Sequence, residues 1–151
     1  MKAKMLFPLV ALGLVVLMAI YFLLNPSYEK SIEAKYYYEI GDYQKAYELA
    51  NEAFSMDLYN RMASTVMAQS KISMKYQKYV KQAKEYLREI NAIAAKQSIS
   101  DADRAKIKMM SEIMVDSYVK LAPSVITDEA LVQEAKTYYK NFEQLLEKVN
   151  R

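Results

Sequence analysis

Cysteine and histidine are absent from this chain of 151 residues, and glycine and proline are rare. Without cysteine the chain has no disulfides, no thiolate metal sites and no lipid attached at a cysteine. Without histidine it lacks the commonest general base, the commonest metal ligand and the Ser-His and Cys-His pairs of nucleophilic catalysis. We therefore expect neither an enzyme nor a metal or cofactor site.

Two pairs of neighbouring carboxylates remain as candidates for acid-base chemistry or metal binding, Asp101 with Asp103 and Asp128 with Glu129. Each pair stands at the start of a predicted helix, where capping and the helix dipole favour acidic side chains. The two glycines of the chain cannot build a phosphate-binding loop or a dinucleotide turn. We interpret both pairs as helix caps and expect no catalytic residue, no cofactor and no small-molecule substrate.

One long apolar run stands near the amino terminus. Met5 to Leu24 form a stretch without a charged residue, which as a helix spans about 30 Å, the thickness of a hydrocarbon core. The residues that follow, Asn25 and Pro26, do not make the small-residue cleavage site of a signal peptide. We therefore predict an uncleaved transmembrane helix over residues 5–24, a short terminus over residues 1–4 and one helical domain over residues 27–151.

The charges beside this run indicate its orientation. Lys2 and Lys4 precede it, whereas Lys30 and Lys35 after it are accompanied by glutamates. Because positive residues flank the cytoplasmic end of a membrane helix, we expect a cytoplasmic amino terminus and an extracytoplasmic helical domain, periplasmic in a bacterium. Without Lys2 and Lys4, 19 of the 21 Lys and Arg residues remain against 18 Asp and Glu. This near balance creates no global field for nucleic acid, and we expect no such partner.

Regular helix is expected along almost the whole chain, because the residues that interrupt helices are scarce and Ala, Lys, Glu, Leu, Met and Tyr abound. Apolar residues recur at steps of three and four, the period of an amphipathic helix. Helices are predicted to begin near Ser27, Tyr43, Leu58, Lys75, Ser100 and Thr127, and Pro123 to end the helix that Ser100 opens. The predicted fold is all-α, with a single N-terminal transmembrane helix followed by about six antiparallel helices.

The stretch from Glu39 to Asn60 indicates an αα-hairpin. Gly41 follows one helical pattern and a second pattern begins two residues later, so the two helices fold back through a very short turn. Small and large residues alternate along the inward stripe of the second helix, which consists of Tyr43, Ala46, Tyr47, Ala50, Ala53 and Phe54. The small residues let the preceding helix come close, with Ile32 and Tyr36 assigned to packing.

Residues 27–60 resemble one 34-residue tetratricopeptide repeat. The resemblance is carried by Ala34 and Tyr37 in the first helix, Gly41-Asp42-Tyr43 at the turn, and Ala46, Ala53 and Met56-Asp57 in the second helix. Leu58 stands where the family usually has a proline. Residues 58–97 resemble a degenerate second repeat without the glycine turn. The resemblance implies a stack of αα-hairpins.

In tetratricopeptide repeats the first helices line a groove that binds a protein. Carried onto this sequence, the resemblance implies a partner-binding surface made of Tyr28, Lys35, Tyr38 and Glu39 from the first repeat and of Gln69 and Ile72 from the second. The basic and asparagine pattern with which some repeats clamp a carboxylate is absent, so a C-terminal peptide is not indicated. We choose Tyr38 as the anchor, because a few aromatic contacts carry most of the energy of such interfaces.

These observations predict an adaptor, or an assembly or stability factor for an envelope protein complex. Only Asn25, Pro26 and Ser27 separate the apolar run from the first helix of the domain. No flexible arm lets the domain search away from the surface, which favours a membrane-borne protein partner.

Two surface features allow more than one interpretation. Fourteen tyrosines, with three in succession from Tyr36 to Tyr38, suit a core as well as a protein interface. Basic residues recur every three to four positions at Lys71, Lys75, Lys78, Lys81, Lys84 and Arg88, nearly unopposed by acids. Such a stripe is either a solvated helix face or a contact with anionic headgroups or an acidic partner.

The last predicted helix offers an alternative function. Leu131, Ala135, Tyr138, Phe142, Leu145 and Val149 alternate steps of four and three, the spacing of a coiled-coil seam. The seam covers fewer than three heptads, so we favour packing as the closing helix of the domain over a dimer zipper. The alternative is a structural single-pass membrane protein that self-associates through its C-terminal helix.

Overall fold

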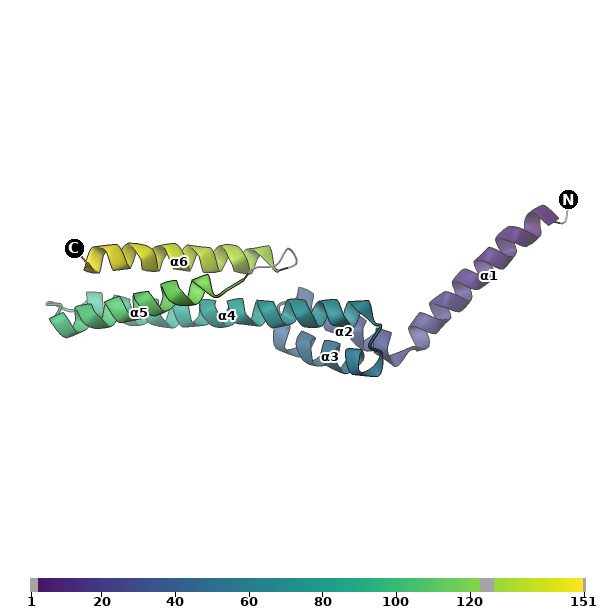
Figure 1. Ribbon diagram of the computed structural model, residues 1–151, viewed down its shortest axis with the longest axis horizontal. Coiled ribbons are helices and arrows are strands. Elements are labelled where there is room, and N and C mark those ends of the chain that lie inside the picture. Colours follow the sequence, from purple (N-terminus) through teal and green to yellow (C-terminus); the bar gives the residue numbers. More distant parts are fainter. Residues whose placement is uncertain (1–2, 123–126, 151) are drawn as a thin grey trace. The chain divides into compact units, whose positions relative to one another are not determined.

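The computed structural model describes residues 3–122 and 127–150, with the side chains of residues 3–6 and 23 left aside. Within these ranges the backbone forms six α-helices and no strand, so the predicted all-α class is confirmed (Figure 1). The helices are α1 (Ala3–Leu24), α2 (Pro26–Glu39), α3 (Tyr43–Met56), α4 (Arg61–Ala94), α5 (Asp101–Val119) and α6 (Glu129–Val149). The chain divides into two compact units, Met1–Lys71 and Ile72–Arg151.

The apolar run near the amino terminus forms α1. Its described side chains lie exposed, as Phe7, Leu9 and Leu24 illustrate. By length and composition no helix in the described part of the chain qualifies alone as a membrane span, but Phe7–Phe22 and α2 qualify together, as a pair bent by 73°. The transmembrane helix over residues 5–24 stays a prediction. Lys2, which contributed to the predicted orientation, lies outside the described residues.

The predicted αα-hairpin is formed by α2 and α3. The side chain of Asn25 caps α2 by accepting a hydrogen bond from the backbone N–H of Ser27 at 3.0 Å, with Pro26 in the first turn. Gly41 adopts a φ of 83°, the left-handed conformation that ends a helix and favours glycine. Asp42 then caps α3 by accepting from the N–H of Lys45 at 3.1 Å.

Small residues make the contact between α2 and α3. On α3 the predicted residues Ala46, Ala50 and Ala53 are fully buried, with Tyr43 beside them. On α2 the buried residues are Ser27, Ser31 and Ala34. The assignment of Ile32 and Tyr36 to packing was wrong, since they are 57% and 60% exposed. This face of α2 shows little apolar periodicity in the sequence, because two of its three buried residues are serines.

The helix α4 corrects the predicted arrangement of residues 58–97. Two helices were expected there, meeting between Met74 and Lys75, but α4 is a single helix of 34 residues. The stretch contains neither glycine nor proline, so no residue in it favours a turn. The second αα-hairpin implied by the resemblance is therefore not formed.

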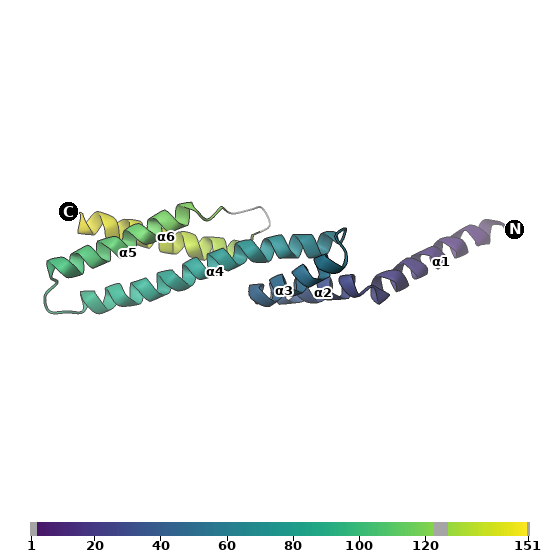
Figure 2. The same ribbon diagram turned by 60° about the horizontal axis from the view of Figure 1, so that its bottom comes forward.

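The unit Ile72–Arg151 consists of the second part of α4 with α5 and α6, which run alongside it in both views (Figures 1 and 2). Its core is formed by Tyr76, Tyr79, Val80, Ala83, Ile90 and Ile93 of α4, Ile107, Met110 and Met114 of α5, and Ala135 and Phe142 of α6. The apolar seam predicted for the last helix packs against this core. Packing as the closing helix is thus confirmed.

The ends of α5 and α6 differ slightly from prediction. Ser100 opens α5 as expected, through a capping box with Asp103. The N-cap of α6 is Asp128, whose side chain accepts from the N–H of Ala130 at 2.9 Å, and not Thr127. The last residue of α5 is Val119, and Pro123, which was expected to end this helix, lies outside the described residues.

Candidate partner-binding groove

A groove of about 420 Å³ lies between α2 and the beginning of α4, within the unit Met1–Lys71. Its lining consists of Lys35, Tyr38 and Glu39 from α2, and of Arg61, Met62, Thr65, Val66 and Gln69 from α4. The groove has a firm base, because Val66 is buried in one cluster with Ala34, Ala46 and Ala50. Helix α2, which forms one side of the groove, is thus held in place by its packing against α3.

Helix periodicity brings these side chains together. On α2 the residues Lys35, Tyr38 and Glu39 are three and four positions apart and share one face. On α4 the positions Arg61, Thr65 and Gln69 follow at steps of four, with Met62 and Val66 beside them. Both rows follow directly from regular helices, and neither needs an unusual backbone conformation.

The groove combines an apolar base with a charged rim. Lys35 and Arg61 carry positive charges and Glu39 a negative one, and all three side chains are exposed. Tyr38 is half-buried and Val66 is buried. An apolar centre with a polar rim is the usual anatomy of a protein-binding surface. The arrangement can hold an apolar side chain of a partner between charges of both signs.

Four of the six residues implied by the resemblance, Lys35, Tyr38, Glu39 and Gln69, line this groove. Tyr28 does not, since its ring stands edge-on to Phe22 at a centroid distance of 4.7 Å. Ile72 also lies elsewhere, because it packs against the core of the unit Ile72–Arg151. Its assignment depended on a second hairpin, which the continuous helix α4 replaces.

Tyr38 was expected to be a surface anchor, but it also contributes to packing. Its ring lies 5.3 Å from that of Tyr43, and its side chain packs against the cluster of Ala34 and Val66. Of the three consecutive tyrosines it is Tyr36 that is exposed. Tyr38 therefore contacts the core on one side and the groove on the other.

Arg61, Met62, Thr65 and Val66 were missing from the predicted surface. Counting back in steps of four from Gln69 would have reached Thr65 and Arg61, the positions on the same helix face. The signal that fixes this register is Asn60, whose Oδ1 accepts a hydrogen bond from the N–H of Ala63 at 3.1 Å and so caps α4.

The basic stripe on α4 was expected to be nearly free of acidic partners, but one of its lysines forms an ion pair. The Nζ of Lys84 lies 2.8 Å from a carboxylate oxygen of Glu134 on α6. The hydrogen bond and the negative charge of Glu134 raise the pKa of Lys84. Lys78 and Lys81 line a shallow hollow with Gln82 and Glu85. At Lys84, at least, the stripe serves to join two helices.

Within the described residues no three side chains of His, Cys, Asp or Glu gather to form a possible metal site. Comparisons of the chain with protein-family models, with curated proteins and with solved structures found no match. The likeness to tetratricopeptide repeats accordingly depends on residues 27–60 and on the hairpin that they form.

Proposed function

We propose that this protein is a membrane-anchored adaptor that binds a membrane-borne protein through the groove between α2 and α4. In this role it supports the assembly or the stability of an envelope protein complex. Residues 5–24 cross the membrane once, with the amino terminus in the cytoplasm and residues 27–151 on the extracytoplasmic side. In this role the protein binds its partner and catalyses no reaction.

The observation that carries this proposal is the composition of the groove. Lys35, Tyr38 and Glu39, which the resemblance to the repeat implies for partner binding, line one hollow together with Gln69 of α4. Its size suits one or two side chains of a partner, and its base is held by buried residues. A fixed hollow favours binding because little side-chain freedom is lost when the partner enters.

The exposed apolar surface of α1 supports the anchor. From Phe7 to Phe22 its large apolar side chains lie uncovered by the rest of the chain. Contiguous apolar surface of this extent marks a site that is covered by lipid or by another protein. Because α2 begins two residues after Leu24, the groove stays near the surface that holds α1, where a membrane-borne partner is within reach.

The alternative function, self-association through α6, has less support. The seam residues Ala135 and Phe142 are fully buried within the chain's own unit, and Leu131, Tyr138, Leu145 and Val149 pack against the same core. A second copy would have to displace α4 and α5 to reach them. This cost favours the adaptor.

Site-specific photocrosslinking in the native membrane tests the proposal. A photoreactive residue at Lys35, in the rim of the groove, should capture one discrete protein. Thr65→Trp, which fills the groove from α4, should abolish this capture, because the added ring occupies the space of the partner's side chain. Asn51→Trp places the same ring on an exposed position of α3 that does not line the groove, and it should leave the capture unchanged. Equal capture with both variants would contradict binding in the groove.

A further inference from the structure

The turn between α3 and α4 exposes two large side chains. Leu58 is 68% and Tyr59 is 91% exposed, and Met56 at the end of α3 is exposed beside them. Tight turns are usually built from Gly, Pro, Asn, Asp and Ser, since these residues satisfy or permit the turn conformation. An adjacent Leu and Tyr at the tip of a turn therefore need a reason other than the turn itself.

Hydrogen bonds fix the backbone of the turn that carries these two side chains. The side chain of Asp57 accepts from the backbone N–H of Tyr59 at 2.9 Å, and the N–H of Asn60 donates to the carbonyl of Asp57 at 3.1 Å. These two bonds to Asp57 fix the backbone around Leu58 and Tyr59.

Buried hydrogen bonds also fix the turn against the start of α2. Asn60 is fully buried, and its Nδ2 donates to the carbonyl and the Oγ of Ser27, at 3.2 and 2.9 Å. Ser27 comes three residues after Leu24, the last residue of the apolar helix α1. Three residues span at most about 10 Å. The tip of the turn is therefore held close to the point where α1 ends.

We propose that Leu58 and Tyr59 insert into the headgroup region of the bilayer that holds α1. The inference depends on the membrane anchor of the proposed function. The headgroup region on each side of the hydrocarbon core is about 5–8 Å thick, a depth that matches the reach of the turn from the end of α1. Tyrosine is enriched at this level of the membrane, because its ring is apolar and its hydroxyl polar.

The charges favour this turn over the exposed apolar side chains of α2. Ile32 and Tyr36 lie exposed on α2, but Glu29 and Glu33 share their helix face at steps of three and four. These carboxylates are repelled by the negative surface potential of a bilayer. The charges beside Tyr59 are those of Asp57, whose carboxylate accepts from the N–H of Tyr59, and of Arg61, which anionic headgroups attract.

A second point of contact would fix the direction in which the groove faces. A single helix in a bilayer leaves the attached unit free to rotate about the axis of that helix. With Leu58 and Tyr59 also inserted, rotation of the unit Met1–Lys71 is restrained. Arg61 lines the hollow beside the turn as well as the groove, so the lipid contact and the partner site are neighbours on one helix end.

Tryptophan fluorescence tests the inference, because the chain contains no tryptophan of its own. The full chain is reconstituted in bilayers of phosphatidylglycerol and of phosphatidylcholine that carries bromine high on its acyl chains, where it quenches nearby rings. Three single variants are compared: Tyr59→Trp at the turn, Tyr21→Trp in α1, and Ile40→Trp at the opposite end of the hairpin. All three positions are exposed, so the substitutions leave the core intact.

We expect quenching and a blue shift of emission for Tyr59→Trp and Tyr21→Trp, and neither for Ile40→Trp. Quenching of Tyr21→Trp without quenching of Tyr59→Trp would leave the anchor in place and overturn the inference, and the turn would then face water or a protein. Absence of quenching for Tyr21→Trp would overturn the anchor and the inference together. Equal quenching of Tyr59→Trp and Ile40→Trp would show a hairpin lying flat on the lipid and would contradict insertion of the turn alone.

Discussion

The side chain of Asn60 donates a hydrogen bond to the Oγ of Ser27 at 2.9 Å across 33 positions of sequence. The same Nδ2 lies 3.2 Å from the Oγ of Ser31, and Ser27 in turn donates to the carbonyl of Ala53 at 2.8 Å. With the bond from the N–H of Ala63 to Oδ1 of Asn60, the cluster joins α2, α3 and α4. Buried polar groups that are all satisfied favour one register of the helices over others.

Replacing Asn60 by alanine should lower the free energy of unfolding by about 2–3 kcal/mol, because a helix cap is lost and buried polar groups are left without a partner. Chemical denaturation followed by circular dichroism measures the change. Asn51→Ala on the exposed face of α3 is the matched control and should stay within about 0.5 kcal/mol of the wild type. A loss for Asn60→Ala no larger than for the control would mean that the cluster contributes little to stability.

The sequence predicted the hairpin because its signals are local. Gly41 follows one periodic segment, and Ala46, Ala50 and Ala53 mark the buried face of the next. The same holds for the inward face of the last helix, where large apolar residues at steps of three and four leave little ambiguity. In these places the pattern of apolar side chains and the buried face coincide.

The inward face of α2 could not be predicted in this way. Ser27 and Ser31 are fully buried because their hydroxyl groups bond to Ala53, Tyr28 and Asn60. A search for apolar periodicity assigns serine to the surface. The partners that make its burial possible come from the next two helices, so the information is not local.

The part of the groove that belongs to the hairpin was predictable from the sequence, and the part on α4 was predictable only in part. Lys35, Tyr38 and Glu39 follow from the repeat pattern of the hairpin, which the chain keeps. Ile72 was assigned on the assumption that the helix after Asn60 would end near Met74. A helix without glycine or proline continues as long as packing supports it, and the core of residues 72–151 supports α4 as far as Ala94.

The close approach of α2 and α3 should not tolerate larger residues. Ala46→Leu or Ala53→Leu should each destabilise the protein by about 1–3 kcal/mol, because neither site has room for three added carbons. Thermal and chemical unfolding measure the effect. Ala68→Leu, at an exposed position of α4, should change the stability by less than about 0.5 kcal/mol. Unchanged midpoints for both core variants would contradict the close contact of α2 with α3.

Truncation of Tyr38 should affect stability as well as binding. Tyr38→Ala removes a ring that packs on Tyr43 and on the cluster of Val66, and a half-buried aromatic side chain contributes about 1–3 kcal/mol. Tyr36→Ala, two residues earlier on α2 and exposed, should change the unfolding free energy by less than about 0.5 kcal/mol. Equal stability of the two variants would place Tyr38 outside the core.

The hydroxyl group of Tyr79 should be dispensable. Tyr79 is 4% exposed, and among the described residues its OH has no hydrogen-bond partner. Burial raises the pKa of this phenol above its usual value, so it stays neutral. Tyr79→Phe should raise the free energy of unfolding by up to about 1 kcal/mol, because an unsatisfied polar group is removed. Tyr139→Phe, which deletes a hydroxyl that donates to Glu143, should bring no such gain. A clear loss for Tyr79→Phe would show that the OH bonds to a buried water.

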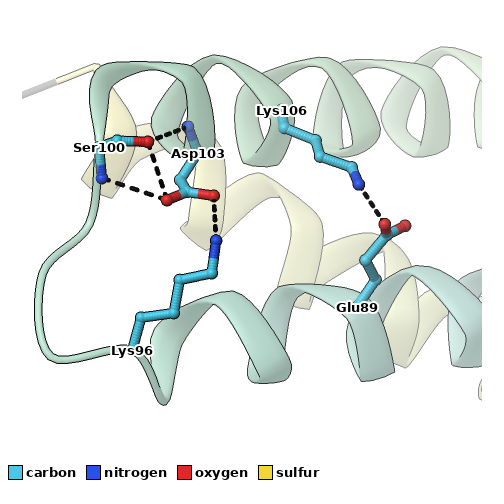
Figure 3. Close-up of polar contacts among 5 residues, drawn as sticks. All are labelled: Glu89, Lys96, Ser100, Asp103 and Lys106. Atoms are coloured by element: carbon cyan, nitrogen blue, oxygen red, sulfur yellow. Dashed lines mark hydrogen bonds and ion pairs between the residues drawn. The ribbon is translucent and has the colours of Figure 1, made fainter.

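The carboxylate of Asp103 should make stability depend on pH in the acid range. Its Oδ1 accepts from Lys96 at 2.6 Å and its Oδ2 from the hydroxyl and the N–H of Ser100, at 2.9 and 3.2 Å (Figure 3). The Lys96 hydrogen bond and those from Ser100 lower the pKa of Asp103 from 3.8 to about 2. A folded-state pKa below the unfolded value gives stability that is present above the unfolded pKa and is lost as the pH falls through the folded one.

The difference in melting midpoint between the wild type and Asp103→Asn should therefore be constant near neutral pH. It should shrink as the pH falls from about 4 to about 2, the interval between the unfolded and folded pKa values of Asp103. Lys96→Met in both backgrounds should weaken this dependence, since the strongest cause of the lowered pKa is removed. Lys106→Met is the matched control, because Lys106 on α5 pairs with Glu89 on α4 (Figure 3) and does not contact Asp103. A difference that stays constant down to pH 2 would mean that the Lys96 contact does not persist in solution.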